Sequence, residues 1–173
     1  MIRQALAKDA SRIAEILVFS KRTNYRRIFH NDAYSFGELQ VCAIARTYQE
    51  DSGLLARTWV YIDNETDAYT GEHIELVKGL VEVQDSEIKT LYTDPFFTDG
   101  GIGHQLISFA KENLAAEHLW VLEKNHRAID FYERNGFRVT GKRIPEEGTP
   151  EFLIEMKLEK EEVLNGTFNR EEI

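Results

Sequence analysis

Cysteine is nearly absent from this chain of 173 residues, in which Cys42 is the single example. One cysteine excludes an intramolecular disulfide and any metal site built from several thiolates. Cys42 lies among apolar residues in a segment whose pattern indicates a helix. We therefore expect it to be a reduced thiol inside the core.

Long apolar runs are also absent. No stretch approaches the ~18 apolar residues that a membrane-spanning helix requires, and the first residues, MIRQALAKDASR, lack the apolar core of a secretory signal. We therefore expect a cytoplasmic protein with no membrane partner. A length of 173 residues with 42% hydrophobic residues suits one globular domain with a sizeable core.

Positive charge is scarce, because 21 Lys and Arg residues face 30 Asp and Glu residues and the formal net charge is -9. Proteins that bind nucleic acids use a positive surface to neutralise phosphates, so nucleic acid is not an expected partner here. A negative surface would attract a cationic amine. Solubility alone, which explains the charge of most acidic proteins of the cytosol, is the favoured interpretation of the same charge.

The hydrophobic periodicity predicts alternating strands and helices in the first half of the chain. The expected order is a strand over 1–5, a helix capped by Asp9 with Ile13, Ile16 and Leu17 on one face, a helix over 34–48, a strand over 57–63, and a hairpin of strands over 74–84 and 87–93. Asp85 and Ser86 are good turn residues between the two hairpin strands. The polar stretch 64–73 leads into this hairpin.

In the second half, apolar residues at helical spacing follow a glycine-rich turn over 98–103. The expected elements are an amphipathic helix carrying Ile102, Leu106, Phe109, Ala110 and Leu114 on one face, a strand over 118–122, a helix over 128–134, and closing strands over 137–144 and 152–158. Residues 160–173 carry two basic and four acidic side chains and are expected to form a charged, solvated tail. The predicted domain is therefore 1–159.

The glycine-rich turn predicts an anion site. Glycines at 100, 101 and 103 let the backbone approach an anion, and the helix N-terminus directs free N–H groups at the same point. An ordinary tight turn would use the same residues. Gly103-His104-Gln105 excludes a P-loop, which needs Gly-Lys-Ser/Thr. The glycine spacing and the position past mid-chain also disagree with a dinucleotide-binding fingerprint.

Two sequence blocks around this turn resemble a known family. They read LYTDPFFTDGGIGHQL over 91–106 and NHRAIDFYERNGF over 125–137. The blocks resemble the pyrophosphate loop (Gln/Arg-x-x-Gly-x-Gly/Ala) and the Asn-x-x-Ala…Phe-Tyr…Gly-Phe segment of GNAT acetyltransferases, separated, as in that family, by one helix and one strand. The resemblance covers 1–159 and implies the GNAT fold. This is a mixed α/β (α+β) architecture with helices flanking a mixed, mostly antiparallel sheet.

The resemblance implies acetyl-CoA as cosubstrate and requires no metal. In the family, the strand before the loop pairs with the pantetheine arm, and a main-chain N–H, here that of Leu91, polarises the thioester carbonyl. Thr98 departs from the family pattern, which has Gln or Arg at this position, so the loop is less positive. The residues implied to bind the cofactor are Leu91, Tyr92, Thr93, Thr98, Asp99, Gly100, Gly101, Ile102, Gly103 and Asn125.

Tyr132 matches the family tyrosine that protonates the departing thiolate. A phenol with a pKa near ~10 can serve as this acid when it is held beside the sulfur. Outside its sequence block, Tyr132 would be read as a buried helix aromatic. Asn125 has two compatible interpretations, as a helix N-cap and as a hydrogen-bonding partner of pantetheine.

An amine acceptor must lose a proton before it attacks. With a pKa near ~10.4, about one amine in a thousand is neutral at pH 7. Glu87 lies four residues before Leu91 on the same strand face, where related histone acetyltransferases carry their catalytic glutamate, so we predict Glu87 as the general base. The alternatives are Glu75, Glu82 and Glu123 acting through ordered water, and, as weaker candidates, His104 and His126.

We therefore expect an N-acetyltransferase that moves the acetyl group of acetyl-CoA directly to a primary amine, without an acyl-enzyme. The alternative is a non-catalytic acyl-CoA-binding or regulatory module of the same fold. The expected acceptor is a small-molecule or peptide amine, selected mainly by the region between the first strand and Trp59, where no motif identifies it. A homodimer is compatible with such a fold.

Overall fold

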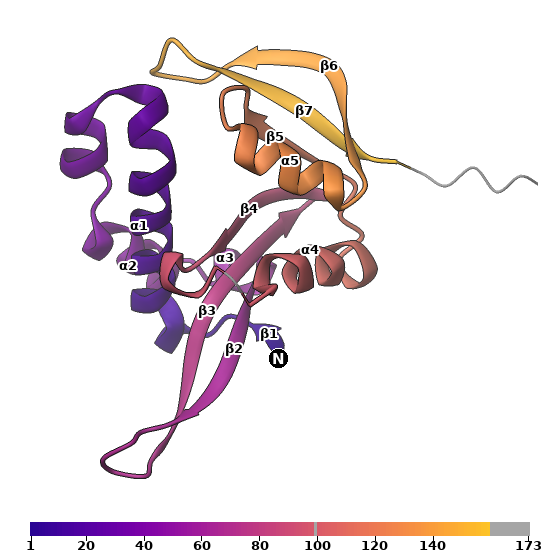
Figure 1. Ribbon diagram of the computed structural model, residues 1–173. Coiled ribbons are helices and arrows are strands. Elements are labelled where there is room, and N and C mark those ends of the chain that lie inside the picture. Colours follow the sequence, from indigo (N-terminus) through magenta and orange to yellow (C-terminus); the bar gives the residue numbers. More distant parts are fainter. Residues whose placement is uncertain (99, 160–173) are drawn as a thin grey trace, which may run out of the picture.

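A seven-stranded sheet runs through the computed structural model, which describes residues 1–98 and 100–159 (Figure 1). Asp99 and the predicted tail over 160–173 lie outside the described residues. All neighbouring strands are antiparallel except β4 and β5, which run parallel. In spatial order the strands are β1 (Ile2–Gln4), β2 (Thr58–Thr66), β3 (His73–Gln84), β4 (Glu87–Thr93), β5 (His118–Leu122), β7 (Phe152–Leu158) and β6 (Phe137–Pro145).

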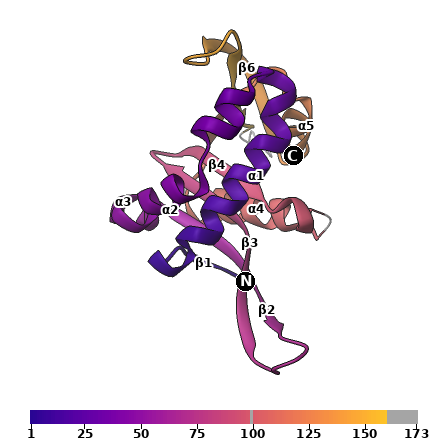
Figure 2. The same cartoon turned by 90° about the vertical axis from the view of Figure 1, so that its left-hand side faces the viewer.

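Helices cover both faces of this sheet, and α1 crosses one face diagonally (Figure 2). The main helices are α1 (Ala10–Phe29), α2 (Val41–Glu50), α3 (Ser52–Arg57), α4 (Ile102–Asn113) and α5 (His126–Arg134). Three short helical segments, η1 (Ala7–Asp9), η2 (Ala33–Glu38) and η3 (Pro95–Phe97), connect them. The predicted mixed, mostly antiparallel sheet flanked by helices is confirmed. Each helix in the described ranges is too short or too polar to cross a membrane.

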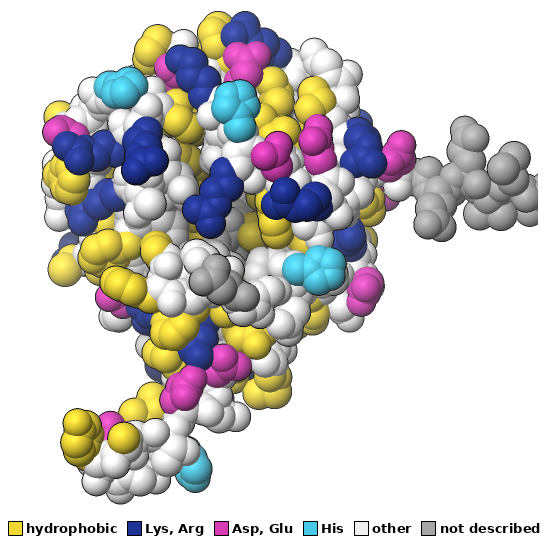
Figure 3. Space-filling model, viewed as in Figure 1, with side chains coloured by type: hydrophobic (Ala, Val, Ile, Leu, Met, Phe, Trp, Pro, Cys, Tyr) yellow, Lys and Arg dark blue, Asp and Glu magenta, His cyan; other side chains and the backbone are white. Residues whose placement is uncertain are grey.

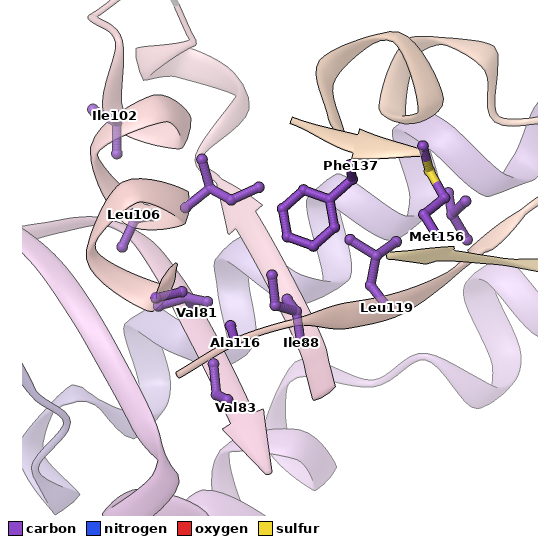
Figure 4. Packing of buried hydrophobic residues seen from close by; sticks show 12 residues of the cluster. Val81, Val83, Ile88, Ile102, Leu106, Ala116, Leu119, Phe137 and Met156 are labelled. Atoms are coloured by element: carbon purple, nitrogen blue, oxygen red, sulfur yellow. The ribbon is translucent and has the colours of Figure 1, made fainter. Parts of the chain in front are cut away.

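Two hydrophobic clusters form the core, one on each face of the sheet. The first includes Val81, Leu106 and Phe137, and in Figure 4 Phe137 lies beside Leu119 and Met156. The second joins α1 to β2 and β3, with Ile13, Ile16, Val60 and Leu80 among its members. Because burial of each large apolar side chain contributes roughly 1.5–3 kcal/mol, these clusters hold the helices against the sheet.

The predicted hairpin is confirmed, including its turn. Asp85 and Ser86 both have positive φ, 50° and 63°, which is the backbone of a two-residue turn that matches the twist of antiparallel strands. The hairpin places β3 and β4 side by side, with Val81 opposite Leu91.

The predicted helix over 34–48 is interrupted. The chain forms η2, becomes extended at Gln40 (φ -111°, ψ 126°) and starts again as α2 at Val41. The Gln40 amide donates hydrogen bonds to the carbonyls of Phe36 and Gly37, which stabilises the break. Leu39 is buried beside it.

Two single-residue expectations in this part of the chain are wrong. Asp9 occupies the position before α1 but does not cap it. Its carboxylate accepts hydrogen bonds from the Arg3 guanidinium (2.7 Å) and the Leu6 N–H (2.8 Å), which ties β1 to the start of α1. Cys42 is exposed. Ala45 and Tyr48 form the buried face of α2, and Cys42 lies outside that face.

Candidate functional site

Strands β4 and β5 separate after a very short ladder. Glu87 pairs with His118 and Ile88 with Leu119, and the described residues show no further pair. Strand β4 nevertheless continues to Thr93, paired along its other edge with β3. The edge of β4 from Lys89 onward therefore faces an opening in the sheet.

A cavity of about 460 Å³ occupies this opening, a volume typical of small-molecule sites. Its walls come from β4, β5, α1, α5 and the turn before α4. Figure 3 shows the surface hollowed between the α1 side and the α5 side, with basic side chains along the rim.

The glycine-rich turn closes one end of the cavity. Gly101 precedes α4 in the left-handed conformation (φ 67°), and none of the described side chains caps this helix. The first N–H groups of α4 and its positive dipole end therefore remain available to an anion. A Cβ at Gly103 would lie 3.3 Å from the Phe131 ring, so glycine here lets α4 and α5 approach closely.

The structure brings most of the predicted cofactor residues to one cavity. Its lining includes Leu91, Tyr92, Thr93, Thr98, Gly101, Gly103 and Asn125. Gly100 lies exposed on the turn, and Ile102 is buried in the core. Asp99 lies outside the described residues. The Asn125 side chain accepts a hydrogen bond from the Ala128 N–H (3.3 Å), as an N-cap does.

Tyr132 lines the same cavity from α5. Its ring packs at an angle against Phe131 (5.3 Å between centroids) and Phe137 (6.0 Å). Burial raises the pKa of Tyr132 above its usual value, and the nearby Tyr25 adds to the shift. The residue is therefore a neutral phenol at physiological pH, which can donate a proton or a hydrogen bond.

Two further tyrosines, Tyr25 and Tyr92, interact electrostatically with Tyr132. The hydroxyl of Tyr25 on α1 is hydrogen-bonded to that of Tyr92 on β4, and both residues line the cavity. Burial raises the pKa of each. The sequence placed Tyr25 in the region expected to select the acceptor but did not predict its contact with Tyr92, because the approach of Tyr25 to β4 depends on how α1 crosses the sheet.

Glu87 lies outside the cavity lining, near the hairpin turn. Its carboxylate accepts a hydrogen bond from the Lys89 ammonium (2.6 Å) and lies 3.7 Å from His118 Nε2. In the β3–β4 register, Ile88 pairs with Val83 and Thr90 pairs with Glu82, although Val83 and Glu82 are adjacent. Lys89 is therefore an extra residue in β4. This bulge puts Glu87 and Leu91 on opposite faces of the strand. The expectation that they share a face is wrong, and the role of Glu87 stays a prediction.

Charged groups also line the cavity, and sequence reasoning did not place most of them there. Lys89, Arg127, Arg134 and His104 contribute positive or titratable groups, and Glu146 is the one carboxylate among the described lining residues. His104 Nδ1 is 2.7 Å from Asn135 Oδ1, which orients its ring. Arg127 and Arg134 come from α5, so their approach is visible only in the folded chain. Residues 1–98 and 100–159 contain no cluster of side chains suited to a metal ion.

Comparison with known proteins gives one family match. Residues 54–139 match a family model described as an acetyltransferase (GNAT) domain, while no curated protein matches the sequence.

Solved structures share the fold at low sequence identity. Apo-form YjaB from Escherichia coli is 22% identical with a TM-score of 0.67, covering 91% of this chain and 95% of that one. PaiA N-acetyltransferase from Thermoplasma acidophilum, in complex with coenzyme A, is 19% identical with a TM-score of 0.59, covering 91% and 98%. An N-acetyltransferase from Staphylococcus aureus Mu50 is 16% identical with a TM-score of 0.63, covering 90% and 98%.

Proposed function

The chain belongs to the GNAT acetyltransferase family, and from this premise we propose that it transfers the acetyl group of acetyl-CoA directly to a primary amine. One observation carries the proposal. The opening between β4 and β5 joins the uncapped N-terminus of α4 to the half-buried Tyr132 within a single cavity.

The geometry supports a specific placement of acetyl-CoA. Its pyrophosphate fits the turn at Gly101 and Gly103, where the α4 N–H groups are free. Its pantetheine arm fits the unpaired edge of β4, as an added strand would. Thr98 carries no positive charge, and Arg127 and Arg134, which also line the cavity, supply positive charge in its place. The structure of PaiA N-acetyltransferase, which shares this fold, is a complex with coenzyme A, which supports coenzyme A as the group bound.

In the proposed reaction, the neutral amine attacks the thioester carbonyl and forms a tetrahedral intermediate. The main-chain N–H of Leu91 stabilises the developing oxyanion. The intermediate collapses with loss of the thiolate, and Tyr132 donates its proton to that sulfur. Because burial keeps Tyr132 neutral, this proton is available throughout the physiological pH range.

A screen of acceptors with thiol-release detection tests this function. Polyamines, lysine-containing peptides, peptides with a free N-terminus and amine-bearing antibiotics form the panel, and mass spectrometry identifies the product. We expect coenzyme A release and a product heavier by one acetyl group with at least one amine. Binding of acetyl-CoA without thiol release across the panel would instead support a non-catalytic acyl-CoA-binding module.

A further inference from the structure

We propose that Glu146, in the turn between β6 and β7, is the general base that removes the proton from the acceptor ammonium. The inference rests on the acetyl transfer proposed above. It replaces the predicted base Glu87 with a residue from a part of the chain that carries no sequence motif.

The first argument is position. Among the described residues that line the cavity, Glu146 alone carries a carboxylate. Two backbone hydrogen bonds hold it in place, from the Glu146 N–H to the Glu151 carbonyl (2.9 Å) and from the Thr149 N–H to the Glu146 carbonyl (3.2 Å). The turn leans toward α1 (Figure 1). Glu146 therefore lines the same cavity as Tyr132 but comes from a different element, so the two groups can serve separately as base and acid.

The second argument is the state of the carboxylate. Within 1–98 and 100–159, the Glu146 side chain has no hydrogen bond or ion pair, so its oxygens are free to accept a proton. The acids considered from the sequence are all ion-paired: Glu75 with Arg3 and Lys8, Glu82 with Arg57, Glu87 with Lys89, and Glu123 with Arg143. A carboxylate held by a cation is a weaker base, because the pairing stabilises its charged form.

The third argument is the surroundings of Glu146. Lys21 and Tyr25 of α1, Tyr34 of η2 and the neighbouring Glu147 all interact with it electrostatically. Burial raises the pKa of Glu146, Glu147 adds to the increase, and Lys21 opposes it. A carboxyl group whose pKa moves toward neutrality is a better general base at physiological pH.

The proton balance of the step is complete. Glu146 takes one proton from the ammonium and later releases it to solvent. The nitrogen lone pair forms the C–N bond, and the C–S bond breaks as the intermediate collapses. Tyr132 gives its proton to sulfur. The second proton that the nitrogen loses restores the Tyr132 phenol. The net products are an amide, coenzyme A and one proton.

Charge-neutral variants compared across pH test the proposal. Glu146→Gln keeps the size of the side chain and removes its charge, and Glu147→Gln makes the same change on the exposed neighbour in the same turn. We expect Glu146→Gln to lower kcat/KM about a hundredfold at pH 7, and to approach wild type near pH 11, where the free amine is largely deprotonated. Glu147→Gln and Glu87→Gln should stay within about twofold of wild type.

Three results would overturn the proposal: a Glu146→Gln rate close to wild type at every pH, an equal loss at every pH, or a pH-dependent recovery shown by Glu87→Gln instead. A normal thermal shift with acetyl-CoA shows that each variant is folded and binds cofactor.

An acceptor-free measurement separates this inference from the proposed function. Carbon-13 NMR follows the titration of labelled glutamate carboxylates, and the signal missing in Glu146→Gln identifies Glu146. We expect the pKa of Glu146 to lie above the usual glutamate value of ~4.3. Titration at or below that value would overturn the base assignment, even if no amine in the panel is acetylated. Failure of the whole panel with a raised Glu146 pKa would count against the proposed function alone.

Discussion

Single residues in the cavity owe their chemistry to burial. Three tyrosines, Tyr25, Tyr92 and Tyr132, line it, and burial raises the pKa of each. Removing a phenol from water penalises its ionised form, so each remains a hydrogen-bond donor at neutral pH. The same effect raises the pKa of Glu146. Burial around one cavity thus favours a neutral acid on α5 and a stronger base in the β6–β7 turn.

Removal of the Tyr132 hydroxyl tests its role as the acid. Tyr132→Phe should lower kcat by roughly ten- to a thousandfold with little change in acetyl-CoA affinity, because only a proton delivered to the thiolate is lost. Tyr69→Phe, at a hairpin residue that is 98% exposed, is the matched control and should be neutral. Turnover of Tyr132→Phe at the wild-type rate would show that Tyr132 is structural.

The alkaline limb of the pH profile provides a further check on Tyr132. An acid must be protonated to act, so activity falls only when the pH exceeds the pKa of the folded protein. Because that pKa is raised, wild-type kcat should persist above the usual tyrosine value of ~10, as far as the protein stays folded. Measurement of kcat with saturating acceptor between pH 8 and 11 tests this, and a loss centred below 10 would contradict it.

At the scale of elements, one extra residue in β4 reorganises the site. The bulge at Lys89 lets Ile88 and Leu91 share the face toward α4 and turns Glu87 away. Just beyond the hairpin turn, β5 leaves β4 after two pairs. The opening that results is continuous with the free N-terminus of α4. Because α4 begins at this opening, the glycine-rich turn before α4 can act as an anion site.

The turn is testable with two arginine substitutions that impose similar backbone strain. Gly101 and Gly71 both have positive φ, 67° and 73°, and both have open space where a Cβ would be. Gly101→Arg should abolish the increase in melting temperature that acetyl-CoA produces by binding the native state. Gly71→Arg, in the distant β2–β3 turn, should retain it. Differential scanning fluorimetry measures both, and an undiminished shift in Gly101→Arg would refute the cofactor placement.

At the scale of the whole molecule, side-chain packing joins two parts of the sheet. The ladder between β4 and β5 contains two pairs, so hydrogen bonds contribute little across it. The first hydrophobic cluster spans this junction, with Phe137 from β6 packed among side chains of β3, β4, β5 and α4. The cavity can stay open because the core beneath it holds its two walls together.

Truncation of Phe137 measures this contribution. Its side chain is fully buried, so Phe137→Ala should lower the free energy of unfolding by about 3–5 kcal/mol. Phe96→Ala, at a residue that is 88% exposed, should change it by less than about 0.5 kcal/mol. Urea denaturation gives both values. A small effect of Phe137→Ala would mean that the two parts of the sheet do not depend on this cluster.

Local features of the sequence were enough to predict the family, the order of the strands, the β3–β4 hairpin and the helix that follows the glycine-rich turn, but they missed α3 and the break between η2 and α2. Each correct prediction depends on residues close together in the chain, through periodicity, turn chemistry or short motifs. They also predicted that Tyr132 and residues around Leu91 and Gly101 would share a site, through the resemblance to GNAT proteins. The structure brings these residues to one cavity.

Only the tertiary structure decided which faces and which distant residues meet. The exposure of Cys42 depends on which side of α2 packs against the sheet, and the face of Glu87 depends on the bulge at Lys89. Tyr25 and Glu146 reach the cavity from segments far apart in the chain. No local pattern in the sequence encodes such contacts. They arise because burial of apolar faces fixes α1 and the β6–β7 turn in position around one opening in the sheet.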